Sequence, residues 1–336
     1  MGIKIGPLET RNRVFLAPMS GVTDEPFRMT AHEHGAGLVV SEMVASEELV
    51  NARPDMLRRA LGAESLSPFV IQLAGREPRW MAEGVRVAED MGADIIDINM
   101  GCPAREVTGG LSGSALMRDL DHAESLIAAT VEAANVPVTL KMRLGWDHTN
   151  LNAPELARRA ENCGVALVTV HGRTRCQFYG GRADWAAIAR VREAISIPLI
   201  ANGDGSSVAD AREMLAKSGA DGVMIGRGAY GRPWWPGVIA EGLDPGSGRG
   251  EPTLAEETEI VTLHHERILS AHGSVHGNRI ARKHIGWAIG RLAERHLITA
   301  DTAADWRASL LRSNDNAAVS RGLAALYATV QERAAA

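Results

Sequence analysis

Cysteine is scarce in this chain, and positive charge is not in excess. The 336 residues include three cysteines, Cys102, Cys163 and Cys176. Their wide and irregular spacing excludes a disulfide framework and a zinc site built from paired cysteines, so we expect no metal. The formal net charge of −5 excludes a uniformly basic coat for nucleic acid. Any nucleic-acid contact must therefore come from a local basic region.

Long apolar runs are absent as well. No stretch approaches the roughly 18 apolar residues that a membrane helix needs. Gly, Pro and charged residues interrupt the apolar residues of segment 1–19, which therefore does not resemble a secretion signal. We expect a cytoplasmic, monomeric protein without membrane contact. Its length suits a barrel-sized domain of roughly 250 residues with a smaller second domain.

Short runs rich in apolar and β-branched residues recur eight times along the first two thirds of the chain. Helical patterns fill the intervals, and several of them close on a glycine suited to a left-handed helix cap. Eight strand–helix units predict an α/β fold, a parallel (β/α)8 TIM barrel. The runs are 14–19, 38–44, 69–75, 94–100, 138–144, 167–173, 198–204 and 222–228.

The remaining third of the chain predicts a small all-α C-terminal domain. Segment 241–252 is rich in Gly and Pro, which is typical of a linker. Thr253 and Glu256 form a capping-box pattern that opens a helix, and helical patterns continue to the end. We therefore expect a barrel over 1–240, a linker over 241–252 and a helical domain over 253–336.

The C-terminal region is basic although the chain as a whole is acidic. Residues 279–336 carry nine Lys and Arg against five Asp and Glu. Arg279, Arg282 and Lys283 share one face of a predicted helix. Such a face is most often merely solvated, but beside a barrel it also suits a large anionic partner.

Polar residues recur at the carboxyl ends of the apolar runs, where a parallel barrel carries its catalytic groups. One or two such residues would be uninformative, whereas a ring of them predicts an active site. The ring comprises Glu42, Gln72, Asn99, Cys102, Lys141, Arg143, His171, Asn202, Asp204 and Arg227.

Glycines follow the seventh and eighth runs, at the loops that commonly bind phosphate in barrels. Gly203, Asp204 and Gly205 come after the seventh run, and Gly226 and Arg227 come after the eighth. These glycines could merely turn the chain. Two such loops with an arginine beside them favour a phosphate site.

Three members of the ring allow more than one interpretation. Lys141 on an apolar strand needs an anion or an electron-rich partner; a buried salt bridge and a Schiff-base role are the alternatives. His171 is either a core histidine or a cofactor ligand. Cys102, where a strand ends in Gly-Cys-Pro, could be a buried hydrophobe, a proton donor or a nucleophile, and its place at the rim favours chemistry. Cys163 and Cys176 are expected to be inert.

Several stretches resemble the tRNA-dihydrouridine synthases, and most closely their bacterial B type. The resemblance covers the chain from about residue 3 to the C-terminal helices. The stretches are LAPMSGVTD (16–24), FVIQLAG (69–75), DINMGCPA (97–104), SGSALMRD (112–119), LKMRLGW (140–146), VHGRTR (170–175), IANGD (200–204), MIGRGA (224–229) and RKHIGW (282–287).

The resemblance implies an FMN-dependent reduction, with NADPH or NADH as reductant, of the C5=C6 bond of a uridine in the tRNA D-loop. It implies that Cys102 is the proton donor and that Asn99 and Arg143 lie near the uracil. It also implies that the basic residues Arg279, Arg282 and Lys283 grip tRNA phosphates. The implied FMN-binding residues are Ala17, Pro18 and Met19 at the ring, Gln72 and Lys141 at its polar edge, His171, and Asn202, Gly203, Asp204, Gly226 and Arg227 at the phosphate.

One segment departs from the subgroup. Glu106, Gly109 and Gly110 stand where basic residues are usual, so we expect different RNA contacts there. The rival functions are a flavin barrel acting on a free pyrimidine, as in dihydroorotate dehydrogenases, a lysine aldolase, and an RNA-binding module without activity. A small substrate would not need the basic helical domain.

Overall fold

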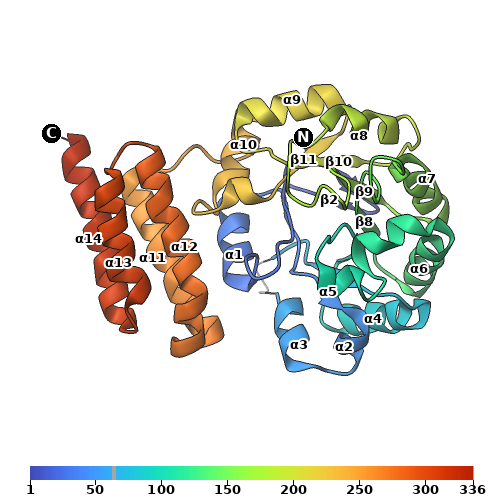
Figure 1. Cartoon of the computed structure of the whole chain (residues 1–336), viewed down its shortest axis with the longest axis horizontal. Helices are drawn as coiled ribbons and strands as arrows, with labels where there is room; N and C mark the ends of the chain where they lie inside the picture. The colour runs from blue at the N-terminus through green and yellow to red at the C-terminus, as the bar shows by residue number, and fades with distance from the viewer. Residues whose placement is uncertain (63–65, 336) are drawn as a thin grey trace.

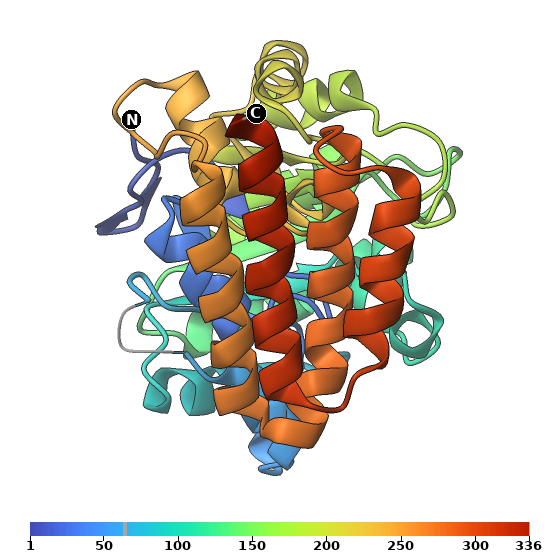
Figure 2. The ribbon, with the colours of Figure 1, turned by 90° about the vertical axis from the view of Figure 1, so that its left-hand side faces the viewer.

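The computed structural model describes residues 1–62 and 66–335. Most of the chain forms a ring of strands enclosed by helices, and four further helices lie side by side against one flank of this ring (Figures 1 and 2). None of the described helices is both long and apolar enough to cross a membrane.

Nine parallel strands form the ring in the order β4-β3-β11-β10-β9-β8-β7-β6-β5. The two strands at the ends of this order come from one predicted run, 38–44, and Val40 next to β4 bridges to Val70 of β6. The predicted eight-strand barrel is thereby confirmed, with its second run split in two. The strands are β3 (Val14–Leu16), β4 (Leu38–Val39), β5 (Val44–Ala45), β6 (Val70–Ala74), β7 (Ile95–Met100), β8 (Val138–Arg143), β9 (Leu167–His171), β10 (Leu199–Asn202) and β11 (Gly222–Ile225).

Helices follow the strands and cover the outside of the ring (Figure 1). Local signals set their ends: Asp184 and Ser207 cap two helices at the start, and Gly164 and Gly219 end two helices in the left-handed conformation, one of them the helix that Ser207 starts. The barrel helices are α1 (Glu25–Glu33), α2 (Ser46–Val50), α3 (Pro54–Ala60), α4 (Pro78–Asp90), α5 (Arg105–Thr108), α6 (Leu120–Ala133), α7 (Ala153–Cys163), α8 (Trp185–Arg192), α9 (Val208–Ser218) and α10 (Trp235–Leu243), with 3-10 turns η1 (Gly113–Arg118) and η2 (Arg227–Ala229).

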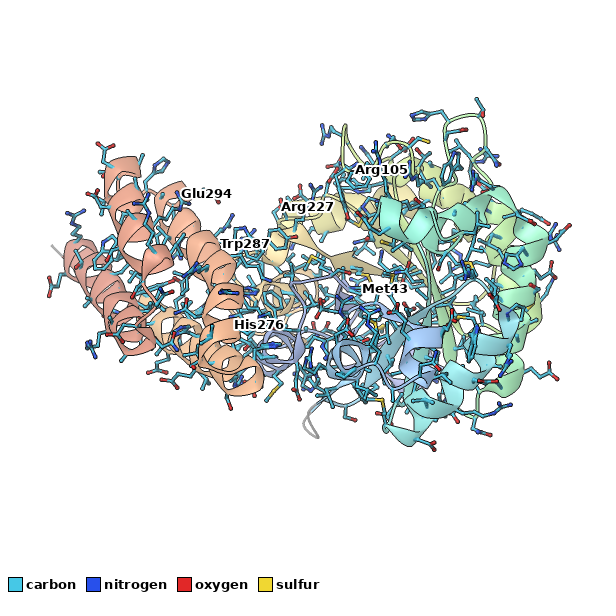
Figure 3. The ribbon with its side chains drawn as sticks, turned by 60° about the horizontal axis from the view of Figure 1, so that its bottom comes forward. Met43, Arg105, Arg227, His276, Trp287 and Glu294 are labelled. Atoms are coloured by element: carbon cyan, nitrogen blue, oxygen red, sulfur yellow. The ribbon has the colours of Figure 1, made fainter. Side chains whose placement is uncertain are left out.

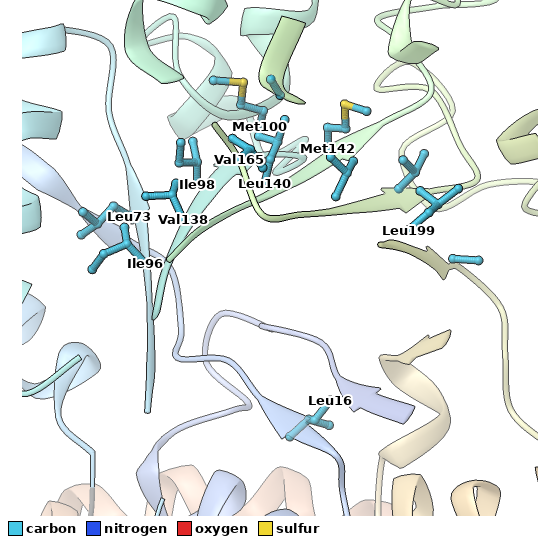
Figure 4. Packing of buried hydrophobic residues seen from close by; sticks show 14 of the residues in the cluster. Leu16, Leu73, Ile96, Ile98, Met100, Val138, Leu140, Met142, Val165 and Leu199 are labelled. Carbon is cyan, nitrogen blue, oxygen red and sulfur yellow. The ribbon is translucent and has the colours of Figure 1, made fainter. Parts of the chain in front are cut away.

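The two faces of each strand bury different residues. On β7, Ile96, Ile98 and Met100 point outward into the layer of helices, together with Leu140 and other outward-facing side chains (Figure 4). At the amino-terminal ends of the strands, the inward-facing residues are apolar and belong to a separate cluster. This cluster also contains residues of the antiparallel hairpin β1 (Lys4–Ile5) and β2 (Leu8–Glu9). This cluster fills the amino-terminal end of the barrel; its strand residues include Phe15, Val70, Ile95, Leu167 and Ile200.

Polar side chains occupy the inward face between this apolar cluster and the carboxyl ends of the strands. The registers place Gln72 beside Asp97 and Asp97 beside Thr139, and one step higher they place Asn99 beside Lys141. Because the carboxyl ends of all the strands point the same way, these layers lead directly to one open end of the barrel.

The C-terminal helices have an apolar core of their own, which includes Ile268, Ile289 and Tyr327. They are α11 (Leu254–His272), α12 (Ser274–Glu294), α13 (Ala300–Arg312) and α14 (Asn316–Ala335). The predicted capping box of Thr253 and Glu256 starts α11.

Segment 241–252, predicted as a linker, begins inside α10 and is fastened to the start of the barrel. Arg13 forms a 2.7 Å salt bridge with Asp244, and Asn12 Nδ2 donates a hydrogen bond to the Ser247 carbonyl. The helices beyond it also contact the barrel directly, since Arg267 of α11 pairs with Glu33 of α1 at 2.7 Å.

Candidate active site

The open carboxyl end of the barrel collects the polar residues that the sequence predicts as a ring. The end of β11 faces α12: Tyr230, just after η2, stacks on Trp287 of α12 with ring centroids 4.0 Å apart. Figure 3 shows Arg227 and Trp287 on the sides of the barrel and the helical bundle that face each other. The candidate site therefore lies at the barrel mouth, beside the helical domain.

Cys102 lies on the turn that follows β7, and both sides of this turn are held. The amides of Gly101 and Cys102 donate to Asn99 Oδ1 at 3.3 and 3.0 Å. On the other side, Arg143 Nε donates to the Gly101 carbonyl at 2.8 Å, and Ser114 Oγ donates to the Cys102 carbonyl at 2.8 Å. These contacts hold the backbone of the turn, and Cys102 is half-buried there.

The electrostatics of the Cys102 thiol suit a proton donor. Burial raises its pKa, while an amide hydrogen bond from Ala104 and the charges of Arg143 and Lys141 act in the opposite direction. The net shift is upward, so the group stays a protonated thiol at neutral pH. The two cations nevertheless favour the thiolate that proton donation leaves behind.

Gln72 and Asn99 interact with each other inside the barrel. Asn99 Nδ2 donates to Gln72 Oε1 at 2.7 Å, and Gln72 Nε2 donates to Asp97 Oδ2 at 2.6 Å. Thr139 Oγ1 donates to the second carboxylate oxygen of Asp97 at 2.6 Å. Burial raises the pKa of Asp97, whereas these hydrogen bonds and Lys141 oppose the rise.

Lys141 and His171 lie in the barrel interior with unused hydrogen-bonding capacity. Burial, followed by the charge of Arg143, lowers the pKa of Lys141 to about 8. Among the described residues, no carboxylate lies within ion-pair distance of its ammonium group, although the charge of Asp97 acts to raise its pKa. Burial and nearby cations hold the pKa of His171 well below its ordinary value, and its buried Nδ1 has no partner among the described residues. Both groups suit an electron-rich ligand.

The loops after β10 and β11 meet around Asp204. Its carboxylate accepts hydrogen bonds from Arg173 at 2.6 Å, from the Ala183 amide at 2.7 Å and from Arg227 at 3.2 Å. Gly203 has φ +117°, and a Cβ there would lie 2.8 Å from the Ala183 Cβ, so only glycine fits. The loop backbone and Arg227, whose side chain is half-exposed, remain available to an anion.

The first and last strands bring their predicted cofactor residues together. A Cβ added at Gly226 would lie 3.6 Å from Met19 Sδ and 3.8 Å from Ala17 Cβ. Pro18 and Met19 are half-buried at this end. Asn202 instead points its side-chain amide at the Met224 carbonyl, 2.7 Å away, and so links β10 to β11.

Two exposed aromatic residues lie at the mouth, on the loop after β9. Phe178 and Tyr179 have ring centroids 4.6 Å apart. The guanidinium groups of Arg143 and Arg227 lie 5.7 and 5.3 Å from the Tyr179 ring. Arg143 also donates to the Phe178 carbonyl at 2.8 Å, so the residue predicted near the substrate also shapes this loop.

The three basic residues predicted on one helix face have different surroundings. Arg279 is exposed on α12. Arg282 donates to Asn314 Oδ1 at 3.0 Å, and Lys283 Nζ donates to the Gly21 carbonyl on the loop after β3. Arg279 is therefore the member of this face that is most open to a partner.

Sequence reasoning did not identify Asp97, Thr139, Arg173 and Tyr179 as residues of the site. Asp97 and Thr139 had a detectable signal, because each is a polar residue two positions before a predicted site residue on the same strand face. Arg173 lies two residues after His171, but its pairing with Asp204 depends on contacts between loops.

Comparison with known proteins agrees with this geometry. The family model described as Dihydrouridine synthase matches residues 15–330. The chain is 59% identical over 286 residues to a probable tRNA-dihydrouridine synthase of Rhizobium leguminosarum bv. phaseoli, covering 85% of this chain and 88% of the relative. It is 51% identical over 340 residues, covering 100% of both chains, to a probable tRNA-dihydrouridine synthase of Rhodobacter capsulatus. It is 47% identical over 285 residues to tRNA-dihydrouridine synthase B of Xanthomonas axonopodis pv. citri, covering 85% and 86%.

Solved structures of low sequence identity share the fold. The 6-hydroxypseudooxynicotine amine oxidase of Pseudomonas geniculata N1 superposes with a TM-score of 0.55 at 15% identity, covering 72% of this chain and 49% of that one. Histamine dehydrogenase from Rhizobium sp. 4-9 has a TM-score of 0.52 at 14% identity, covering 85% and 50%. The family match spans almost the whole barrel and the helices that follow it. The chain therefore belongs to the dihydrouridine synthase family.

Proposed function

We propose that this chain is an FMN-dependent tRNA-dihydrouridine synthase that reduces the C5=C6 bond of a D-loop uridine with NADPH or NADH. The observation that carries the proposal is the position of the Cys102 turn at the barrel rim, where Arg143 holds it and Lys141 lies on the same strand as Arg143. Family membership supports the reaction and the tRNA substrate. We also propose that the enzyme works as a cytoplasmic monomer without a metal.

The residues present fit FMN. The Nδ1 of His171 is buried without a partner among the described residues, and the partly buried Lys141 lies in the same barrel interior; a flavin edge rich in oxygen and nitrogen would supply a partner for both. The glycine at position 203 and Arg227 would hold the phosphate. Ala17, Pro18 and Met19 would lie beside the ring. Gln72, Asn202, Asp204 and Gly226 would complete the site, with Asn202 and Asp204 shaping it through the contacts described above.

Proton donation is the task that we assign to Cys102. When bound, the flavin would supply hydride chemistry at C6 of the uracil, and negative charge would then develop at C5 and on the C4 oxygen. The Cys102 thiol gives its proton to C5, and the product is 5,6-dihydrouridine. Arg143 and Lys141 stabilise the resulting thiolate, which regains a proton from solvent. Asn99 and Arg143, which fix the turn, would lie near the uracil.

The surroundings of the mouth suit an RNA substrate. A stacked, paired base cannot enter a barrel, so the target uridine must leave its stack. The exposed Phe178 and Tyr179 rings with Arg143 and Arg227 offer the stacking and charge that unstacked nucleotides bind. We assign the grip on tRNA phosphates to the helical region 253–336, with Arg279 as its open basic residue and Arg282 and Lys283 beside it.

Replacing Cys102 by alanine tests the proposal. We expect Cys102→Ala to keep its flavin, seen as absorption at about 450 nm, and to keep oxidising NADPH. Dihydrouridine formation in tRNA should fall by a factor on the order of 10² to 10⁴, the usual contribution of a general acid. Cys163→Ala on α7 is the matched control and should retain full activity. Unchanged dihydrouridine formation by Cys102→Ala would remove the proton-donor assignment.

A further inference from the structure

A continuous row of hydrogen bonds runs from the barrel interior to the turn that carries Cys102. It starts at the buried carboxylate of Asp97, which is 4% exposed, and passes through the side chains of Gln72 and Asn99. It ends at the amides of Gly101 and Cys102. The N–H side of the turn therefore depends on residues in the row, whereas its carbonyl side depends on Arg143 and Ser114.

The donor and acceptor roles along this row are fixed by its end at the turn. Backbone N–H groups can only donate, so Asn99 must offer them its oxygen. Its amide nitrogen then faces Gln72, which must present Oε1. The Gln72 amide nitrogen consequently faces Asp97, and the row needs an acceptor at that position. Asp97 meets this need with Oδ2.

The same logic limits what the two amides can offer a ligand. Asn99 Oδ1 already accepts two hydrogen bonds, and one N–H of Asn99 Nδ2 is used by Gln72. Only the second N–H of this amide remains for a ligand. Gln72 likewise has one free N–H, besides one lone pair on Oε1. Together with Lys141, the row therefore has mostly donors left for a ligand.

We propose that Asp97 is a positioning residue for the reaction. By accepting from Gln72, it keeps Gln72 and Asn99 in the orientation that holds the Cys102 turn in place. Without this acceptor, the buried Gln72 N–H would be unsatisfied, the amide would seek another partner, and Asn99 would lose its support. The proposal rests on the proposed function only in assigning proton donation to Cys102.

Thiol reactivity tests the positioning directly. We would compare Asp97→Ala, Asp97→Asn and Thr139→Val with the unaltered holoenzyme, measuring alkylation of each cysteine by iodoacetamide through peptide mass spectrometry. The loss of one buried hydrogen bond predicts about tenfold faster alkylation of Cys102 in Asp97→Ala, because a freed turn exposes the thiol. Asp97→Asn keeps an acceptor for Gln72 and should react at the original rate. Thr139→Val removes only the hydrogen bond from Thr139 to Asp97 Oδ1, which lies outside the row, so Cys102 should also react at the original rate in this variant.

Cys163 on α7 serves as the internal control in every sample. Equal acceleration at Cys163 and Cys102 would mean that Asp97→Ala loosens the whole barrel and would overturn the proposal. An unchanged Cys102 rate in a folded Asp97→Ala protein would also overturn it. Should Asp97→Ala fail to fold, Gln72→Leu breaks the row at its next member and is expected to give the same acceleration; no acceleration would overturn the proposal.

Activity provides the second readout. Asp97→Ala should lower kcat for dihydrouridine formation about tenfold, and Asp97→Asn should restore it. In a Cys102→Ala background the same substitution should have little further effect, because both changes act on one group. If the losses of kcat from Asp97→Ala and Cys102→Ala multiplied fully in the double variant, the positioning role would be overturned. Normal activity of Cys102→Ala alone would instead refute the proton-donor assignment, while the alkylation result would still decide whether Asp97 holds the turn.

Discussion

Replacing Arg173 by methionine should destabilise the loops that we assign to phosphate binding. Arg173 is 1% exposed, although it carries a full charge. Its guanidinium group donates to the carbonyls of Gly180 and Gly181 at 3.0 and 2.6 Å and to Asp204 Oδ2 at 2.6 Å. Arg173→Met keeps much of the apolar stem, so its effect isolates these three hydrogen bonds and the charge.

The structure sets the size of this effect. Removing one partner of a buried ion pair typically costs about 3–5 kcal/mol. The side chain of Asp204 is 27% exposed, so water can partly replace the lost guanidinium group, and we expect about 3 kcal/mol. With an unfolding entropy of roughly 2.1 cal/mol/K per residue, this corresponds to a fall in melting temperature of about 4 °C.

Thermal unfolding followed by circular dichroism measures this change, and Arg190→Met is a matched control. Arg190 is exposed on α8, and its loss should change the stability by less than about 0.5 kcal/mol. An Arg173→Met protein that melts like the unaltered one would refute the reasoning.

The effect of Arg173 should also depend on pH. Partial burial acts to raise the pKa of Asp204, but hydrogen bonds from Arg173 and the Ala183 amide, with the charges of Arg173 and Arg227, bring it below its ordinary value of 3.8. A carboxylate with a lowered pKa contributes stability that is complete above the unfolded pKa and is lost as pH falls through the folded pKa. The difference between the two proteins should therefore be constant near neutral pH and shrink below about pH 3.8. A difference that persists unchanged into acid would contradict the assigned partner.

Two further predictions concern the ligand and the RNA. Because burial and Arg143 lower the pKa of Lys141 to about 8, flavin affinity measured by fluorescence titration should weaken as pH rises through 8. Lys141→Met should remove this pH dependence. An equal pH dependence of flavin affinity in Lys141→Met would mean that another group causes it. Arg279→Glu should weaken tRNA binding several-fold and lower the salt slope of log affinity by about one, with flavin content unchanged. Unchanged tRNA affinity in Arg279→Glu would show that the basic face of α12 is only solvated. Lys283→Glu should instead lower the melting temperature, since Lys283 donates a hydrogen bond to the Gly21 carbonyl.

The order of the elements could be predicted from the sequence because the signals for strands and helices are local. Eight apolar runs with helical patterns between them predicted the barrel, and the fold confirms it. The split of run 38–44 into two strands could not be predicted, because it reflects the path around the ring rather than composition. The position of Cys102 at the rim also followed from the sequence, since a strand that ends in Gly-Cys-Pro in a parallel barrel must end at that rim.

Pairings between distant side chains were decided by the tertiary structure alone. Strand register placed Asp97 between Gln72 and Thr139, and loop packing placed Arg173 against Asp204. The alternation along a strand marks Asp97 as an inward-facing residue but does not reveal its partners, because these depend on the closure and tilt of the whole sheet. The partner of Arg173 depends on how two loops pack, which leaves no periodic pattern. The basic helix face shows the same limit: the sequence shows that its charges share one side of a helix, and only the packing of α12 on the barrel decides that Lys283 binds the protein while Arg279 stays open.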